Sequence, residues 1–334
     1  MTHGGDIFAI AAARGWDWRD VADFSASINP LGPAPGVRAA ICQAVDRIQH
    51  YPEREPKRLR EALSETWKVP MDSILLGNGA TELIFFIARL FKQRASSLAA
   101  PVFSEFHRAF PDAHLSSLSD PETWPGKEML VLTTPANPTG TSIELAVLRR
   151  RLEQSPEPVI VDESFGEFSN LPSASALVAD FPHLIVLRSL TKFYALPGLR
   201  LGALVADASV LSEWRKRREP WQVNVLAEQA ALAALADQHH SQRTVEFVRK
   251  ERDFLMEEIE GIPGTVPHRS DANFIYVSLS YRAQEVTDHL LRSKVLVRNC
   301  ADWPGLEGEA VRIAVRTRSE NERLLRAWNE FRCA

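Results

Sequence analysis

One lysine of the chain, Lys192, stands where a nucleophilic amine could do covalent chemistry. It closely follows the apolar run His183–Arg188, which predicts a buried strand, and apolar residues surround it. Ligands of α/β proteins bind at the carboxyl ends of parallel strands, where a lysine amine can form a Schiff base. A lone lysine of this kind is more often a surface residue with a buried stem. The assignment therefore depends on its neighbours.

Two groups near Lys192 in the sequence could bind a phosphate. Ser189 lies three residues before the lysine, and Arg200 lies eight residues after it. A guanidinium donates charge-assisted hydrogen bonds to phosphate oxygens, and a hydroxyl can donate a further one. The spacing therefore predicts a phosphorylated cofactor at Lys192.

Asp162 ends the apolar run Val159–Val161 and is predicted at the carboxyl end of a buried parallel strand. A buried carboxylate is costly unless a cation pairs with it. In a pyridoxal-5′-phosphate (PLP) site that cation is the protonated pyridine nitrogen, and the pairing makes the ring an electron sink. The alternative is that Asp162 only caps a following helix.

Two turns that follow predicted strands could complete such a site. The segment Gly77–Glu82 opens an apolar-striped helix, where backbone N–H groups and the helix dipole favour an anion. Such turns also occur as plain connections. The segment Thr133–Gly140 is more specific, because its two prolines and its glycine fix a turn that aims the Asn137 amide into the crevice.

The middle of the chain must position these residues. It alternates apolar strands with helical patterns such as Thr81–Lys92 and Ile143–Gln154, which predicts an α/β layer with a mostly parallel sheet. The predicted strands are Ser73–Leu76, Ser97–Ala100, Met129–Thr133, Pro158–Asp162, His183–Arg188 and Leu201–Ala206.

The rest of the chain has a different character. A helical pattern runs from Trp221 to Glu260 and predicts a long bridging element, whereas the N-terminal forty residues show few periodic signals. After Gly264 the pattern predicts a small α+β domain. Its strands are Asn273–Ser278, Val295–Arg298 and Ala310–Val315, and its helices are Ala283–Arg292 and Ser319–Phe331.

Composition limits the partners. A net charge of −4 and a pI near 6.2 give no electrostatic reason to expect nucleic acid or an anionic membrane. The cysteines Cys42, Cys300 and Cys333 fit no metal spacing, so no metal site is expected and the thiols are expected to be reduced. We find no secretory signal and no long apolar run, which predicts a cytoplasmic protein.

Taken together, these motifs resemble the fold-type I PLP enzymes, the aspartate aminotransferase superfamily, through nearly the whole chain and in the family's order. The resemblance implies the α/β fold of PLP-dependent transferases, with a large domain whose mostly parallel sheet is flanked by helices and a smaller α+β C-terminal domain. It divides the chain into an arm over the active site at 1–34, a large domain at 35–255 and a small domain at 256–334.

The same resemblance implies site residues. PLP would be the cofactor, with Lys192 and Asp162 as the catalytic residues. Asn137 would bond to the ring's 3-oxygen and Phe103 would stack on the ring. Tyr51 resembles the tyrosine that reaches a neighbouring subunit's phosphate, which implies a homodimer with shared active sites. The phosphate would be held by Gly79, Ala80, Thr81, Ser189 and Arg200.

The reaction depends on which bond at the substrate's α-carbon is perpendicular to the ring, and so on the residues that hold the substrate's anionic groups. Arg298 and Arg312 lie on predicted small-domain strands, where two guanidinium groups could clamp a phosphate and a carboxylate. The alternative is that they are ordinary surface arginines.

Several segments resemble the L-threonine-O-3-phosphate decarboxylases of cobalamin biosynthesis, relatives of the histidinol-phosphate aminotransferases. They are His3–Gly5, Ser25–Gly32, His50–Glu53 and Phe165, the last of which stands where many transaminases have tyrosine. The resemblance implies decarboxylation of threonine phosphate to (R)-1-amino-2-propanol O-2-phosphate. The substrate contacts would be His3, Gly4, Ser27, Asn137, Arg298 and Arg312.

Two alternatives to the decarboxylase remain open. One is an aminotransferase of the class I/II type, acting on histidinol phosphate or another amino compound. The other is a non-catalytic binding or regulatory protein with the same fold, against which the intact pair of Lys192 and Asp162 argues. Ser27 also stands where the decarboxylase family often has asparagine, and the shorter side chain leaves room for a bridging water.

Overall fold

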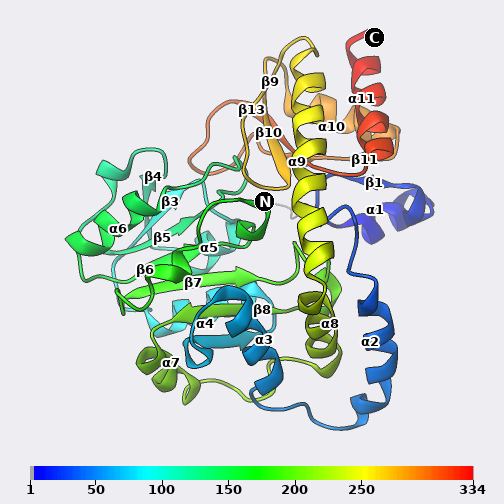
Figure 1. Ribbon diagram of the computed structural model, residues 1–334. Helices are drawn as coiled ribbons and strands as arrows, with labels where there is room; N and C mark the ends of the chain where they lie inside the picture. The colour runs from blue at the N-terminus through cyan, green and yellow to red at the C-terminus, as the bar shows by residue number, and fades with distance from the viewer. Residues whose placement is uncertain (1–3, 334) are drawn as a thin grey trace.

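A seven-stranded sheet forms the larger part of the computed structural model, which describes residues 4–333 (Figure 1). The strand order is β2-β8-β7-β6-β5-β3-β4, and β8 alone of these strands runs antiparallel to its neighbours. This arrangement confirms the predicted fold class. The strands are β2 (Ile74–Gly77), β3 (Ser96–Ala100), β4 (His114–Ser117), β5 (Met129–Thr133), β6 (Val159–Asp162), β7 (Leu184–Ser189) and β8 (Gly202–Ala206).

Helices cover both faces of this sheet, so its inner strands are buried along their whole length and mostly apolar. One face packs against Ile84, Phe106 and Trp214, which come from α4 (Ala80–Leu90), α5 (Ser104–Ala109) and α7 (Ala208–Arg215). The other face packs against residues of α3 (Lys57–Trp67), α6 (Leu145–Gln154) and α8 (Val225–Ala236).

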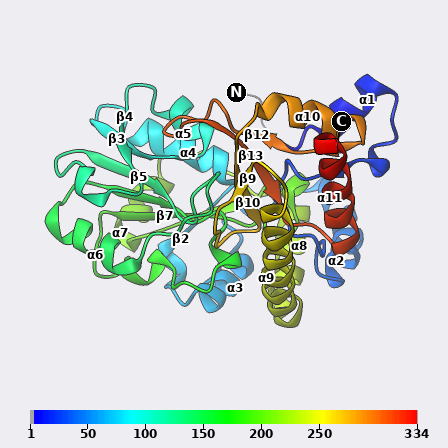
Figure 2. The same ribbon diagram turned by 90° about the horizontal axis from the view of Figure 1, so that it is seen from above.

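A smaller antiparallel sheet has the order β12-β13-β10-β9. Its strands are β9 (Thr265–Pro267), β10 (Phe274–Leu279), β12 (Arg298–Asn299) and β13 (Glu309–Ala314). The same part of the chain contains the helix α10 (Ala283–Arg292), between β10 and β12, and the helix α11 (Arg318–Cys333), after β13. Figure 2 shows α9 (Gln238–Glu260) and α11 side by side next to this sheet. The predicted strand over Val295–Arg298 is in fact two short strands, because the chain leaves one sheet for another.

The first of these, β11 (Val295–Leu296), pairs in parallel with β1 (Ala22–Asp23) and so joins the N-terminal segment to the small sheet's side of the molecule. The same segment contains α1 (Ile7–Arg14) and is followed by α2 (Gly36–Ala44). The structure therefore gives the N-terminal forty residues more regular elements than their sequence predicts. Figure 1 shows α1 at the outer edge of the molecule beside β1 and β11, and its Ala11 shares one apolar cluster with Val21 and Leu296.

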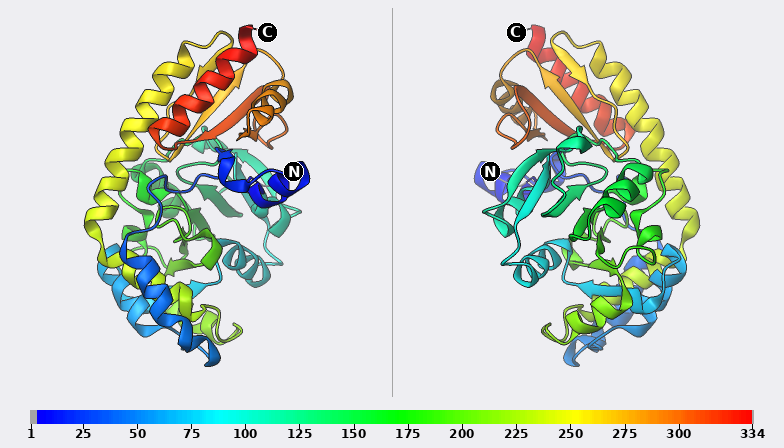
Figure 3. Two further views of the ribbon diagram at one scale, coloured as in Figure 1. Left: turned by 90° about the vertical axis from the view of Figure 1, so that its right-hand side faces the viewer. Right: turned by 90° about the vertical axis from the view of Figure 1, so that its left-hand side faces the viewer.

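The helix α9 (Gln238–Glu260) connects the two sheets. Its 23 residues span about 35 Å, and Figure 3 shows it running along one edge of the molecule from α8 to the small sheet. It contacts β9, β10 and α11 at one end and the 3-10 turn at Gly166–Phe168 on the large-sheet side. The predicted bridging helix is confirmed, with a break at Asp237. The exact division into three domains stays a prediction.

No helix among residues 4–333 is both long and apolar enough to span a membrane.

Candidate active site

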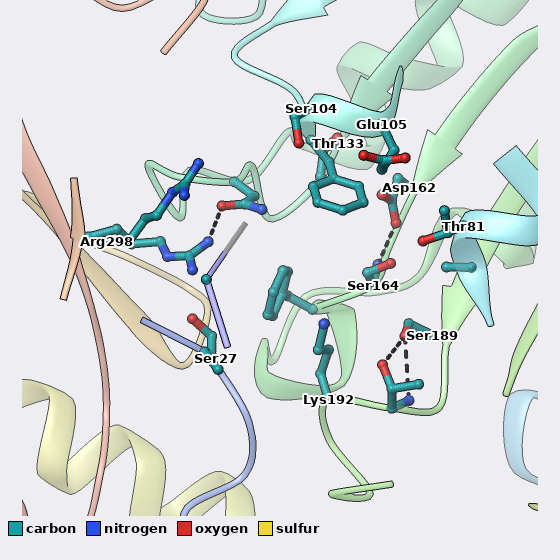
Figure 4. Close-up of a pocket in the computed structure, with 18 of the residues that line it drawn as sticks. Ser27, Thr81, Ser104, Glu105, Thr133, Asp162, Ser164, Ser189, Lys192 and Arg298 are labelled. Carbon is teal, nitrogen blue, oxygen red and sulfur yellow. Dashed lines mark hydrogen bonds between the residues drawn. The ribbon is translucent and has the colours of Figure 1, made fainter. Parts of the chain in front are cut away.

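A cavity of about 400 Å³ opens at the carboxyl ends of β5, β6 and β7, between the large sheet and the small one (Figure 4). The structure brings together in its wall most of the residues that the sequence singles out. These are Gly4, Ser27, Ala80, Thr81, Phe103, Asn137, Asp162, Ser189, Lys192, Arg200, Arg298 and Arg312. Gly79 directly precedes Ala80 in the chain but is not part of the cavity wall, and Tyr51 also lies outside the wall. His3 falls outside the described residues.

Lys192 projects into the middle of this cavity (Figure 4). Burial is the largest cause that lowers the pKa of its amine, and together with the positive charges of Arg312 and Arg200 it brings that pKa to about 8. At pH 7 about a tenth of such amines are neutral, far more than for an ordinary lysine. The environment therefore makes Lys192 a usable nucleophile.

Asp162 is 2% exposed at the end of β6. Its Oδ1 accepts a 2.8 Å hydrogen bond from the Ser164 amide, and it forms no ion pair with any residue of 4–333. Burial raises the pKa of this carboxyl to about 6, despite the opposing effect of the Ser164 bonds. A buried acid without a cation is the arrangement that a protonated ring nitrogen would complete.

The amino terminus of α4 provides an anion site next to Lys192. Gly79 precedes the helix with a φ of +85°, and a Cβ at this position would lie 2.5 Å from the Arg200 Nη2. Only glycine therefore lets the guanidinium approach the first turn of α4. The hydroxyls of Ser189 and Thr191 lie 2.7 Å apart at the same end of the cavity. The cluster suits a phosphate.

Asn137 connects the two sides of the cavity. Its Oδ1 accepts a 2.5 Å hydrogen bond from Arg312 Nη1, which leaves the amide N–H groups as donors toward the cavity. The Oγ1 of Thr133 is buried nearby without a hydrogen-bond partner among the described residues. Phe103 and Phe165 also line the cavity, and Phe165 packs edge-on against Phe274, with the ring centroids 4.9 Å apart.

The small sheet brings two arginines to the cavity, and Figure 4 shows one of them, Arg298, on the far side of the cavity from Asp162. Arg298 on β12 lies directly opposite Arg312 on β13 in the antiparallel register. Arg312 Nη2 donates a 2.6 Å bond to the Ser25 carbonyl oxygen, and burial lowers the Arg312 pKa to about 10. Both are buried, unlike surface arginines.

The N-terminal segment closes the same side. Gly4 and Ser27 line the cavity, and the Gly5 amide donates a 3.0 Å bond to the Ser25 Oγ. The Oγ of Ser27 is buried and has no hydrogen-bond partner among residues 4–333. This hydroxyl is therefore available to a ligand.

Sequence reasoning missed several residues of the cavity wall. Serine and threonine hydroxyls give no pattern of their own, and the pair of Glu105 with Arg108, 2.8 Å apart, looks like an ordinary helix pair. Trp303 comes from a loop without any motif. The missed residues are Ser25, Ala26, Ser104, Glu105, Arg108, Thr133, Ser164, Thr191 and Trp303.

Tyr51 lies away from the cavity of its own chain. It is 81% exposed and stacks on Trp221 with the ring centroids 4.6 Å apart. Its expected role toward a neighbouring subunit stays a prediction.

Comparison with known proteins agrees with this geometry. The model of the aminotransferase class I and II family matches residues 112–327. This chain belongs to that family. It is 35% identical to the threonine-phosphate decarboxylase of Salmonella typhimurium over 97% of this chain and 95% of the relative. It is also 35% identical to the histidinol-phosphate aminotransferase of Symbiobacterium thermophilum, over 92% and 90% of the two chains.

Solved structures share the fold. The L-threonine-O-3-phosphate decarboxylase of Porphyromonas gingivalis superposes with a TM-score of 0.87 at 23% identity, covering 94% of this chain and all of the other. The family membership makes this protein a PLP-dependent enzyme. The unpaired Asp162, the low-pKa amine of Lys192 and the anion site at α4 fit that cofactor.

Proposed function

We propose that this enzyme decarboxylates L-threonine O-3-phosphate to (R)-1-amino-2-propanol O-2-phosphate, a step of cobalamin biosynthesis. The observation that carries the proposal is the buried pair of Arg298 and Arg312, next to the unpaired hydroxyl of Ser27. Threonine phosphate has two anionic groups, a phosphate and a carboxylate, and a pair of guanidinium groups can hold both. The identity with the Salmonella decarboxylase supports the proposal.

The charges of the cavity support an anionic substrate. Glu105 pairs with Arg108, so the remaining wall has one acid, Asp162, and four basic side chains. The basic side chains are Lys192, Arg200, Arg298 and Arg312. Lys192 and Arg200 lie on the cofactor side. The two small-sheet arginines are then left for the substrate.

The cofactor, when bound, supplies an electron sink for the pair released by the broken bond. Lys192 would hold it covalently, Asp162 would keep the ring nitrogen protonated, and Asn137 would donate to the ring's 3-oxygen. Ala80, Thr81, Ser189 and Arg200 would bind its phosphate at the amino terminus of α4. These assignments follow the positions of the side chains in the cavity wall.

The substrate side would choose the bond that breaks. Arg298 and Arg312 together would anchor the phosphate and keep the carboxylate out of the ring plane, because that orientation favours loss of carbon dioxide. Carbon dioxide would leave without the electron pair of the broken bond, so the α-carbon would have to take a proton in its place. The amine of Lys192, whose pKa near 8 lets it carry and release a proton at neutral pH, would make that transfer.

A second candidate is an aminotransferase of the histidinol-phosphate type. The equal identity with the Symbiobacterium enzyme favours it. Incubation of the purified enzyme with threonine phosphate alone, and with histidinol phosphate plus 2-oxoglutarate, separates the two. The decarboxylase releases carbon dioxide from the first mixture without an acceptor. Turnover of the second mixture alone would establish the aminotransferase.

We further propose a homodimer with shared active sites. The exposed Tyr51, stacked on Trp221, and the exposed Ile48 on the adjacent turn supply an apolar face for a second copy. If Tyr51 completes the neighbour's phosphate site, a mixture of inactive Tyr51→Ala and Lys192→Ala variants should recover part of the activity. No recovery after demonstrated subunit exchange would count against shared sites.

A further inference from the structure

The loop over residues 300–308, between β12 and β13, fastens the small sheet's side of the molecule to the large one at the cavity. The Nε1 of Trp303 donates a 3.1 Å hydrogen bond to the carbonyl oxygen of Val102. Gly305 packs on Ala100 so closely that an added Cβ would lie 2.5 Å from the alanine Cβ. The large domain therefore fixes the edge of the Trp303 indole.

The face of the same indole contacts Arg298. The guanidinium carbon lies 5.5 Å from the centroid of the Trp303 ring, within the range of cation–π attraction. Both residues line the cavity, and Trp303 is only 4% exposed. No hydrogen bond or ion pair joins the Arg298 guanidinium to another residue of 4–333. The indole is therefore the contact that sets the direction of this guanidinium.

Arg312 is held differently, although it is the direct cross-strand partner of Arg298. It donates to the Asn137 Oδ1 and to the Ser25 carbonyl oxygen, so polar groups fix it. The Arg312 guanidinium carbon also lies 5.2 Å from the centroid of the Phe274 ring. Of the two arginines, only Arg298 has a guanidinium that no hydrogen bond or ion pair fixes among residues 4–333, so its position depends on the aromatic face of Trp303.

We propose that Trp303 is a positioning residue that aims Arg298 at the anionic group of the substrate. The hydrogen bond to Val102 fixes the indole relative to the large sheet. The face of the indole then orients the Arg298 guanidinium and leaves its N–H groups free to donate. The inference rests on the proposed function only in taking the substrate to be a phosphorylated amine or amino acid.

A double-mutant cycle on the PLP-loaded enzyme tests this. The dissociation constant of O-phospho-L-threonine is measured by stopped flow, from the rapid change in the cofactor's absorbance that precedes turnover, for the native enzyme, Trp303→Ala, Arg298→Ala and the double variant. Trp303→Ala should weaken binding by about 3- to 30-fold in the native background. In the Arg298→Ala background the same change should have no effect, because Trp303 acts through the arginine.

Two phenylalanine variants sharpen the test. Trp303→Phe keeps an aromatic face but loses the bond to Val102, so its effect should be smaller and should still vanish without Arg298. Trp124→Phe is the matched control, because the Trp124 Nε1 donates a comparable 2.8 Å bond to the Ser117 carbonyl oxygen and the residue is outside the cavity wall. It should leave the dissociation constant unchanged.

Losses that multiply in the double variant would overturn the inference, as would equal effects of the two phenylalanine variants. If Trp303→Ala does not fold, the cycle with Trp303→Phe decides by the same criterion. Failure of the proposed function looks different. The enzyme would then bind histidinol phosphate and release no carbon dioxide from threonine phosphate. The cycle run with histidinol phosphate would still show the coupling of Trp303 with Arg298.

Discussion

The two sides of the cavity are built in different ways. The cofactor side consists of the ends of strands in the large sheet and the amino terminus of one helix, α4. Asp162 at the end of β6 and Ser189 at the end of β7 belong to it. The substrate side joins distant parts of the chain, namely the N-terminal segment, β12, β13 and the 300–308 loop. Figure 4 shows this division. Arg298 and Ser27 lie on one side of Lys192, whereas Asp162 and Thr81 lie on its other side.

The difference indicates that the cofactor side determines the chemistry, whereas the substrate side determines the specificity. A rigid sheet keeps the cofactor groups in one geometry whatever the substrate, whereas the substrate groups depend on how the small sheet and the N-terminal segment meet the large one. Changes on the cofactor side should therefore remove all activity. Changes on the substrate side should alter binding and the choice of reaction while the cofactor stays bound.

The largest effect is expected at Lys192. Lys192→Ala removes the only amine in the cavity wall that the structure describes, so activity should fall by at least about 1,000-fold. Borohydride reduction of the native enzyme should fix the cofactor on this residue, and a peptide mass map locates the adduct. An adduct on another lysine would refute the assignment.

The arginine pair should come next. Arg312→Lys and Arg298→Lys should each lower kcat/KM for threonine phosphate by about 30- to 1,000-fold, because an ammonium cannot make the planar two-point contact. Arg312 should show the larger loss, since it also holds Asn137. The absorbance of the bound cofactor should persist in both variants. If either arginine variant lost the cofactor, the claim that these arginines act only on the substrate side would be wrong.

The pH dependence of cofactor uptake should report the cofactor side alone. The Lys192 pKa is lowered from 10.5 to about 8, and only the neutral amine attacks. The rate of PLP uptake by the cofactor-free enzyme should therefore rise about tenfold per pH unit below pH 8 and level off above it. Stopped-flow absorbance measures this rate. A rate that keeps rising to pH 10 would mean an ordinary lysine.

The smallest effect is expected from deleting residues 1–5. The deletion removes His3, which lies outside the described residues, and Gly4, which lines the substrate side. Affinity for threonine phosphate should fall by about 3- to 10-fold, roughly the contribution of one hydrogen bond. The absorbance of the bound cofactor should not change. A loss of cofactor affinity would assign this segment to the cofactor side.

The same contrast explains what the sequence could predict. Asp162, Asn137 and Lys192 follow apolar strands whose carboxyl ends must share one sheet edge, so pattern and topology place them together. The sequence also predicts Arg298 and Arg312 on small-domain strands, whereas the register that sets them directly opposite each other is known only from the structure. Nothing local marks Trp303, because its contacts with Val102 and Arg298 depend on how two parts of the fold meet.

The sequence fails to predict some secondary-structure elements for similar reasons. The edge strand β4 is mostly polar and exposed, so it lacks the apolar run that reveals the inner strands. The two-residue strands β1 and β11 exist only because the N-terminal segment reaches the small sheet's side of the molecule. Tyr51 gives no structural signal within one chain, since its stacking on Trp221 is an ordinary surface contact.

The reaction of threonine phosphate in heavy water tests the central proposal most directly. If the substrate side directs loss of the carboxylate, the product is aminopropanol phosphate with a single deuterium on the carbon that lost it, in equal amount to the carbon dioxide released and without 2-oxoglutarate. Mass spectrometry of the product reads this directly. A keto product that forms only when 2-oxoglutarate is added, with no carbon dioxide, would contradict the proposal.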